Sequence, residues 1–268
     1  MHRKRYAMKR LIKGILRRFG VDVVTYDPKP VKSVRTKTLS YFETATGNYY
    51  LPRDAQADQI AAEIKAGRVF DKEIVSVAQQ YAKPGTAALD VGANFGQMSI
   101  LFSNIVGDRG KVYSFDADDF IFEILTKNIA ANGREGRIVP VFGAVHNVAG
   151  QTLYFPVQDF ERFPTYGSYG IDYAGNTGRP VPTLTIDSLN IAEPISFMKV
   201  DVQGGDLQAM QGAVGTIARN KMPIVFEYEY RFEAQYKLSF QAYVDFVSQI
   251  GYRFESVIEG YNYLIVPR

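Results

Sequence analysis

The 268-residue chain contains no cysteine and only two histidines, His2 and His146. The absence of cysteine excludes disulfides, thiolate metal sites and a cysteine nucleophile, and it is typical of a reducing compartment. Two histidines are too few for a histidine-rich metal site, and no metal-ligand spacing stands out, so we expect no metal. No apolar run approaches the roughly 18 to 20 residues of a membrane span. The basic N-terminus also lacks the uninterrupted apolar core of a signal peptide, and we therefore expect a cytoplasmic protein.

Charge is divided unevenly along the chain. Residues 1–38 carry twelve Lys and Arg against Asp22 and Asp27, a net charge of +10, whereas the other 230 residues carry a net charge of −7. A mildly acidic body argues against nucleic acid as a partner. With 268 residues, 46% of them hydrophobic, the chain is long enough to bury a sizeable core.

The basic arm has the pattern of an amphipathic helix that ends at Gly20, because apolar residues from Met8 to Phe19 recur at helical spacing among basic ones. Such a helix can rest on an anionic membrane surface. We therefore expect a peripheral contact with the inner face of the membrane. A clamp across the acidic body, a homodimer contact and a nucleic-acid-binding tail are the alternatives.

Beyond the arm, hydrophobic patterns alternate between strands and helices, which predicts an α/β fold with a doubly wound, mostly parallel sheet. Predicted strands are Ala87–Val91, Lys111–Phe115, Arg137–Phe142, Ile195–Val200 and Pro223–Tyr228, and a hairpin of Tyr252–Val257 and Tyr261–Val266 closes the seven-stranded sheet in antiparallel fashion. Predicted helices are Asp54–Ala66, Phe70–Ala82, Gly96–Val106, Asp118–Asn132, Asp206–Arg219 and Leu238–Ile250. We expect an arm over 1–67 and one domain over 68–268.

The most informative motif is Leu89–Gly96, at the junction of the first predicted strand and helix. Open α/β sheets bind ligands beyond the carboxyl ends of their strands. A dinucleotide fingerprint needs Gly-x-Gly-x-x-Gly, but Asn94 and Gln97 stand where its second and third glycines would be. Pyrophosphate binding is therefore disfavoured, and the acidic Asp90 suits a cationic ligand better than a phosphate.

A second acidic residue, Asp116, ends the next predicted strand 24 residues after Gly92. An acid at that position accepts hydrogen bonds from two ribose hydroxyls, although a helix N-cap is the simpler alternative. Together, the two motifs predict an adenosine-type ligand without a phosphate, and S-adenosylmethionine fits that description.

At these residues the sequence resembles the FkbM-type S-adenosylmethionine-dependent methyltransferases, which have the Rossmann-like class I methyltransferase fold. The resemblance covers residues 68–268 and rests on Leu89–Gly96, Gly110–Asp116, Val181–Leu189, Phe197–Gly204 and Asn262–Pro267. It implies O-methylation of a hydroxyl on a carbohydrate, such as a glycan, or on a small molecule, such as a secondary metabolite. The family usually has Glu where this chain has Asp116 and Gln203. The first difference keeps a carboxylate, whereas the second removes one from the expected active site.

The expected cofactor-binding residues are Glu73, Asp90, Gly92, Ala93, Asn94, Gly96, Ser99, Asp116, Ala117 and Gly143. Several of them have simpler structural explanations: a tight turn and helix cap for Asp90, Gly92 and Gly96, and helix packing for Asn94 and Ser99. The resemblance makes the region of Asp71 and Glu73 a candidate contact to the amino group of the cofactor.

Asp201 and Lys199, at the end of the fourth predicted strand, are the candidate catalytic residues. They would remove the proton of the acceptor hydroxyl or orient that hydroxyl, and a structural ion pair is the alternative. His146 is a further candidate base. The candidate substrate contacts are Glu227 and the aromatic residues Tyr166 and Tyr169, which lie in an expected acceptor-site insertion over 154–182; an inserted loop packed on the sheet edge is the other interpretation.

Two further classes of function stay open at this stage. A nucleotide-binding oxidoreductase would need a glycine at Asn94 and a place for pyrophosphate, and the sequence offers neither. A non-catalytic scaffold that retains the cofactor fold remains an alternative because of Gln203.

Overall fold

The computed structural model describes residues 38–53, 55, 57–156, 165–171, 178–258 and 260–268. Residues 1–37 of the basic arm, with the expected amphipathic helix and membrane contact, lie outside the described residues, and so does part of the aromatic segment. None of the helices within these ranges combines the length and hydropathy that a membrane crossing requires.

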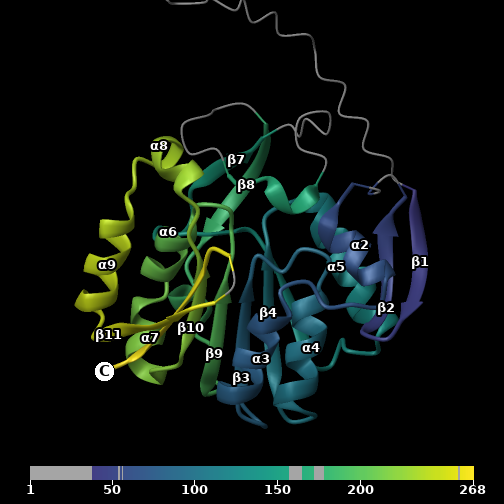
Figure 1. Cartoon of the computed structure of the whole chain (residues 1–268), viewed down its shortest axis with the longest axis horizontal. Helices are drawn as coiled ribbons and strands as arrows, with labels where there is room; N and C mark the ends of the chain where they lie inside the picture. The colour runs from purple at the N-terminus through teal and green to yellow at the C-terminus, as the bar shows by residue number, and fades with distance from the viewer. Residues whose placement is uncertain (1–37, 54, 56, 157–164, 172–177, 259) are drawn as a thin grey trace, which may run out of the picture. The chain divides into compact units, whose positions relative to one another are not determined.

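A seven-stranded sheet forms the centre of the described structure, in the order β11-β12-β10-β9-β3-β4-β5 (Figure 1). Its strands are β3 (Ala87–Val91), β4 (Lys111–Asp116), β5 (Ile138–Phe142), β9 (Ile195–Val200), β10 (Ile224–Glu227), β11 (Tyr252–Val257) and β12 (Asn262–Pro267). Strands β5, β4, β3, β9 and β10 are parallel, and β12 pairs antiparallel with both β10 and β11. The predicted fold class, including its closing hairpin, is confirmed.

Helices cover both faces of this sheet. One face packs against α3 (Lys72–Tyr81), α4 (Gln97–Val106) and α5 (Asp119–Ala131), and the other against α6 (Asp206–Gln211), α7 (Val214–Asn220) and α9 (Phe240–Gln249). Successive side chains of a strand point to opposite faces, so Ala88 of β3 belongs to the first core and Leu89 to the second. Burial on both faces explains why the central strands are almost wholly apolar.

Two predicted helices differ from the structure. The helix predicted over Asp206–Arg219 is divided into α6 and α7 at Gly212, where a Cβ atom would overlap the carbonyl oxygen of His146. This close packing against the chain after β6 (Ala144–Val145) interrupts the helix. The helix predicted to begin at Asp54 is α2 (Gln59–Lys65), which begins later because Asp58 caps it by accepting a hydrogen bond from the Ala61 N–H.

Several smaller elements have no counterpart in the prediction. Strands β1 (Leu39–Thr44) and β2 (Gly47–Pro52) form a hairpin, and β7 (Thr152–Phe155) and β8 (Arg179–Leu184) form a second small sheet with β6. Short helices are η1 (Tyr166–Ser168), η2 (Asp187–Leu189), η3 (Tyr230–Phe232) and α8 (Glu233–Tyr236). The hairpin is bound to α5, since Asn128 and Asn132 accept hydrogen bonds from the backbone of β2 at 2.6 and 2.9 Å. The domain boundary at residue 67 stays a prediction.

Candidate functional site

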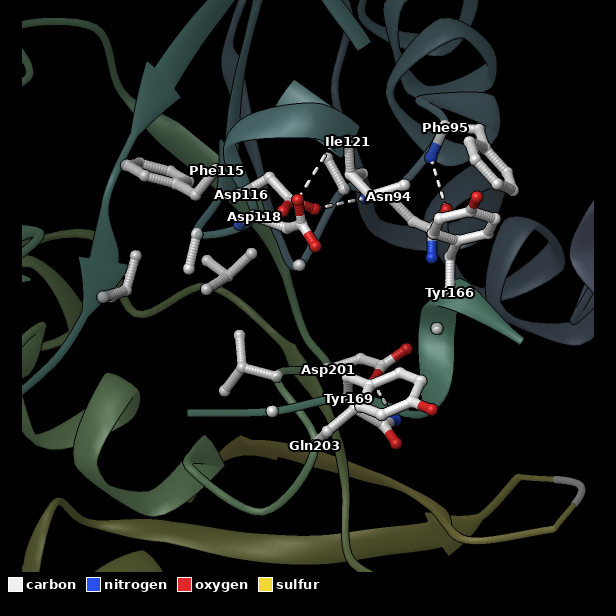
Figure 2. A pocket seen from close by; sticks show the side chains of 18 of the residues that line it. Asn94, Phe95, Phe115, Asp116, Asp118, Ile121, Tyr166, Tyr169, Asp201 and Gln203 are labelled. Carbon is white, nitrogen blue, oxygen red and sulfur yellow. Dashed lines mark hydrogen bonds between the residues drawn. The ribbon is translucent and has the colours of Figure 1, made fainter. Parts of the chain in front are cut away.

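A pocket of about 1060 Å³, which includes its part open to solvent, lies at the carboxyl ends of β3, β4 and β9. Residues 166–171 form part of its wall (Figure 2). Four carboxyl groups line it, those of Asp71, Asp116, Asp118 and Asp201, and Lys199 is the one cationic side chain of the described lining. The position is the one at which open parallel sheets bind ligands, and the described part of the wall has more carboxyl groups than cationic groups.

The loop after β3 approaches β9 so closely that only glycine fits at its first position. Gly92 has φ of +84°, and a Cβ atom there would overlap the carbonyl oxygen of Asp201. The N–H groups of Gly92 and Ala93 donate to the carbonyl of Phe115 at 3.0 and 2.8 Å. The loop is therefore fixed against the ends of both neighbouring strands.

Asp116 closes the other side of this loop. One of its oxygens accepts the Asn94 N–H at 2.9 Å, and the other accepts the Asp118 N–H at 2.9 Å. Burial, together with the charge of Asp118, raises the pKa of Asp116 to about 7 despite these two donors. Asp118 caps α5 and pairs with Arg179 at 3.0 Å. In Figure 2 the side chains of Asp116, Asp118 and Asn94 gather on one wall.

Asp90 and Ser99 lie behind the pocket wall rather than on it. Asp90 is fully buried, and one of its oxygens accepts the Ser99 hydroxyl at 2.5 Å. Its other oxygen finds no hydrogen-bond partner among the described residues and lies 3.6 Å from Nζ of Lys199. Burial raises the pKa of Asp90, and the ammonium group opposes that shift. Asp90 is thus a buried counter-charge beneath Lys199.

Lys199 connects this buried acid to the pocket. Its ammonium group donates to the Gly92 carbonyl at 2.8 Å and lies 3.5 Å from Oδ2 of Asp201. Burial lowers the pKa of Lys199, but Asp201 and Asp90 outweigh burial and hold that pKa above its ordinary value. The side chain of Lys199 is 6% exposed and that of Asp201 27%. Lys199 is therefore a fixed cation, whereas Asp201 presents a carboxylate to the pocket.

Gln203 lies on the other side of Asp201. Its side-chain N–H groups donate to Oδ1 of Asp201 at 3.0 Å and to Oε2 of Glu227 at 2.8 Å. Burial and the charge of Asp201 raise the pKa of Glu227 well above its ordinary value. Gln203 lines the pocket, whereas Glu227 lies behind it.

Tyr166 and Tyr169 belong to the short segment that crosses the pocket. Tyr166 is 7% exposed, its ring packs against those of Phe95 and Phe120, and its N–H donates to Asp58 at 2.7 Å. Tyr169 packs against the cluster of Ala144, Phe155, Ile171 and Val181, and it lines the same pocket as Asp201 and Gln203. Both tyrosines line the pocket, but the ring of Tyr166 is held mainly by neighbouring aromatic rings.

The structure thus brings most of the sequence-predicted residues to one pocket. Those in its lining are Gly92, Ala93, Asn94, Asp116, Ala117, Gly143, Lys199, Asp201, Tyr166 and Tyr169. Glu73, Asp90, Gly96, Ser99, His146 and Glu227 lie outside the lining that the described residues form. His146 lies outside the pocket lining because β6 pairs with β8 and the His146 N–H donates to the Leu184 carbonyl. Burial lowers the pKa of His146.

Sequence reasoning did not assign several lining residues to the site, among them Phe70, Gln97, Asp118, Ala144 and Ile171. Asp118 could have been found, because it follows Asp116 by two residues at a helix start. The others come from loops, the start of a helix and the short strand β6, which carry no motif of their own.

A sequence model described as the methyltransferase FkbM domain matches residues 90–254. No curated protein matches the chain. The chain is 14% identical to a solved FkbM methyltransferase from Methylobacillus flagellatus KT, with a TM-score of 0.45, and the match covers 71% of this chain and 49% of that one. It is 12% identical to a putative rRNA-methylase from Clostridium thermocellum, with a TM-score of 0.45 and 72% and 92% of the two chains covered. For an S-adenosylmethionine-dependent O-methyltransferase from Thermotoga maritima, the identity is 14%, the TM-score 0.43, and the coverage 81% and 72%.

Proposed function

The chain belongs to the methyltransferase FkbM family, and we propose that it transfers a methyl group to a hydroxyl oxygen of a carbohydrate or other small acceptor. It is a methyltransferase that uses S-adenosylmethionine. The observation that carries the proposal is a carboxylate on the pocket wall, Asp201, which Lys199 and Gln203 hold at 3.5 and 3.0 Å.

The pocket fits a cationic nucleoside. A sulfonium ion suits a wall with four carboxyl groups and one described amine. We assign Asp116 to the two ribose hydroxyls, because it ends the strand next to the glycine loop. The loop from Gly92 to Asn94 and the acid Asp71 would bind the methionine end, and Ala117 and Gly143 the base.

The cofactor, when bound, supplies a methyl group already activated by its sulfonium charge. The residues of this chain then have to align the acceptor and remove its proton, since an alcohol is a poor nucleophile until that proton leaves. Asp201 accepts the proton at a carboxylate oxygen. Lys199 keeps its own proton and stabilises the charge of Asp201.

The surroundings of Asp201 favour a polyhydroxylated acceptor. Tyr169 lines the same pocket as Asp201 and Gln203, and an aromatic face offers apolar surface against which a sugar ring can pack. We propose Tyr169 as the aromatic contact and the carboxylate of Asp201 as the contact to the reacting hydroxyl. The ring of Tyr166 instead packs on Phe95 and Phe120, so Tyr166 would contact the acceptor only through its edge. Glu227 would act through Gln203.

The test is mass spectrometry for a methylated product after incubation with S-adenosylmethionine and candidate glycans and metabolites. A product on oxygen supports the proposal, and methylation of nitrogen or carbon contradicts it. A non-catalytic scaffold would be stabilised by S-adenosylhomocysteine in thermal melts and yield no product. A dinucleotide enzyme would be stabilised by NAD instead.

Replacing Asp116 by alanine is expected to weaken S-adenosylhomocysteine binding by about 1.5 to 3 kcal/mol, the range for hydrogen bonds to a charged group, or roughly 10- to 150-fold. Isothermal titration calorimetry measures the change. Asp245→Ala is the matched control, because Asp245 is exposed on α9 and bonded to Gln241. If folded Asp116→Ala binds S-adenosylhomocysteine as tightly as the wild type does, the assignment of Asp116 to the ribose hydroxyls is wrong.

The affinity for S-adenosylhomocysteine should also depend on pH. With the pKa of Asp116 near 7 in the free protein, the carboxyl is mostly protonated at pH 6 and must lose that proton before it can accept two hydroxyl donors. Binding is therefore expected to be about tenfold weaker at pH 6 than at pH 8. Asp116→Asn, which has no carboxyl to ionise, should bind weakly with a smaller dependence on pH. An equally steep dependence in that variant would assign the titration to another group.

The peripheral membrane contact and the homodimer expected from the basic arm stay predictions.

A further inference from the structure

The side chain of Gln97 joins three segments of the chain beside the pocket. Gln97 is the first residue of α4, directly after the loop that follows β3, and it stands where a dinucleotide fingerprint would have its third glycine. It is 4% exposed and belongs to the pocket lining. Its amide nitrogen donates to the Arg68 carbonyl at 2.8 Å and to the Thr46 hydroxyl at 3.2 Å, and its amide oxygen accepts the Phe70 N–H at 3.0 Å. The start of α4 is thus bonded to the β1–β2 turn and to the segment before α3.

The orientation of this amide is fixed, because its backbone partners cannot exchange roles. A backbone N–H can only donate and a backbone carbonyl can only accept, so the oxygen of Gln97 has to face Phe70 and its nitrogen has to face Arg68. Each of the two N–H bonds of the amide already has an acceptor. Gln97 therefore acts on the pocket through the backbone that it holds, rather than by donating to a ligand.

The segment that Gln97 holds leads directly to Asp71, an acid of the pocket lining. Asp71 has φ of +50°, in the left-handed region, and its side chain does not cap α3, which begins at the next residue. A residue with a side chain adopts this conformation at a cost and keeps it only where its surroundings hold it. The charge of Asp71 contributes to the raised pKa of Lys199, so its carboxyl group acts on the cation of the pocket.

Helices hold the two ends of the same segment. The Arg68 N–H donates to the Glu63 carbonyl of α2 at 2.9 Å, and the Asp71 carbonyl accepts the Ile74 N–H of α3 at 3.0 Å. Gln97 holds the segment between these ends, at the residue before Asp71, and bonds it to the helix that starts at the glycine loop. Loss of the amide would leave both ends in place and allow the peptide at Phe70 to rotate, which turns the side chain of Asp71.

We propose that Gln97 is a positioning residue that orients the Asp71 carboxylate toward the ammonium group at the methionine end of the cofactor. This inference rests on the proposed function, in which Asp71 and the glycine loop bind that end. A carboxylate held in one direction forms a stronger hydrogen bond with an ammonium group than one that can turn away. Gln97 thereby increases the preference of the pocket for a ligand that carries this amino group, without touching the group itself.

The test compares the affinities of the full-length protein for S-adenosylhomocysteine and for its deamino analogue, which lacks the ammonium group, by isothermal titration calorimetry. Asp71→Asn is expected to lower the preference for S-adenosylhomocysteine roughly 10- to 150-fold, the range for a hydrogen bond between charged groups. Gln97→Met, which replaces the amide by an apolar chain of similar length, is expected to lower it about three- to tenfold, the loss for one weakened hydrogen bond. In Asp71→Asn protein, Gln97→Met should lower it no further, since both residues act on the same contact.

A third ligand, 5′-methylthioadenosine, separates positioning from general damage, because it has the nucleoside and the sulfur but no amino-acid end. Its affinity should be the same in Gln97→Met as in the wild type. An equal loss of affinity for all three ligands would assign Gln97 a purely structural role and overturn the inference. If Gln97→Met does not fold, Gln97→Ala decides the question, because it removes the amide without placing an apolar chain against the Phe70 N–H.

Gln241→Met is the matched control, since Gln241 is exposed near the start of α9 and its side chain donates to Asp245 at 2.7 Å. It should leave all three affinities unchanged.

The two possible failures can be told apart. A preference that falls in Asp71→Asn but not in the Gln97 variants overturns the positioning role and leaves Asp71 as the contact to the amino group. A preference that stays unchanged in Asp71→Asn refutes that contact, and the positioning role with it. Neither measurement involves the acceptor, so the transfer of a methyl group to oxygen is tested separately by the methylated product.

Discussion

Asp201→Asn is expected to lower turnover by roughly 10²- to 10⁴-fold, the usual contribution of a positioned general base. Asparagine has nearly the same shape as aspartate but cannot accept the acceptor's proton. Lys199 keeps Asp90 at 3.6 Å and the Gly92 carbonyl at 2.8 Å, so the strand end should stay in place. Affinity for S-adenosylhomocysteine should change much less than turnover.

Initial rates with the acceptor found by mass spectrometry measure the effect, with binding followed by calorimetry on the same samples. Asp245→Asn, a change of the same kind on α9, should keep wild-type rates. Turnover near wild type in Asp201→Asn would instead identify the Lys199–Asp201 contact as a purely structural ion pair.

The second large effect is expected from Gly92→Ala. The added Cβ would overlap the carbonyl of Asp201, so either β3 and β9 separate at their ends or the loop is displaced. We expect a loss of about 4 kcal/mol or more in the free energy of unfolding and loss of S-adenosylhomocysteine binding. Chemical denaturation and calorimetry measure the two.

The variant Gly85→Ala separates the effect of steric overlap of an added Cβ from the effect of backbone strain at positive φ. Gly85 has φ of +80°, close to the +84° of Gly92, and no described atom lies within 4 Å of the position that an added methyl group would take. In this control the free energy of unfolding should fall by only about 1 to 2 kcal/mol, the penalty for a residue with a side chain in the left-handed conformation. Equal losses of unfolding free energy in the two variants would show that the close approach of the Asp201 carbonyl to Gly92 does not determine the effect of Gly92→Ala.

The sheet could be predicted because the residues that specify each of its strands lie close together in the sequence. Strands β3 and β9 are mostly apolar and buried on both faces, and Gly92 and Asp116 each stand at the end of a strand whose position follows from such a pattern. Parallel strands deliver such ends to one edge, so Asp116 and Asp201 could be placed in one pocket before their distances were known.

The parts that could not be predicted depend on contacts between distant residues. The β1–β2 hairpin is held to α5 by Asn128, 78 residues from its partner Tyr50. Gln203 is bonded to Glu227 and Arg231, which are 24 and 28 residues away. Hydrogen bonds of this kind leave no periodic signal in the sequence. The resemblance to the FkbM methyltransferases implied a missing carboxylate at residue 203 but not the two acids that the amide there would join.

With four carboxyl groups against one amine in the described lining, we expect the pocket to bind S-adenosylmethionine more tightly than its product. Methyl transfer removes the positive charge from sulfur, and in the proposed function the proton of the acceptor passes to Asp201, which is part of the wall. The spent cofactor is then an uncharged thioether that no longer attracts the surrounding acids. We therefore expect the negative wall that attracts the cofactor also to favour release of the uncharged product after each reaction.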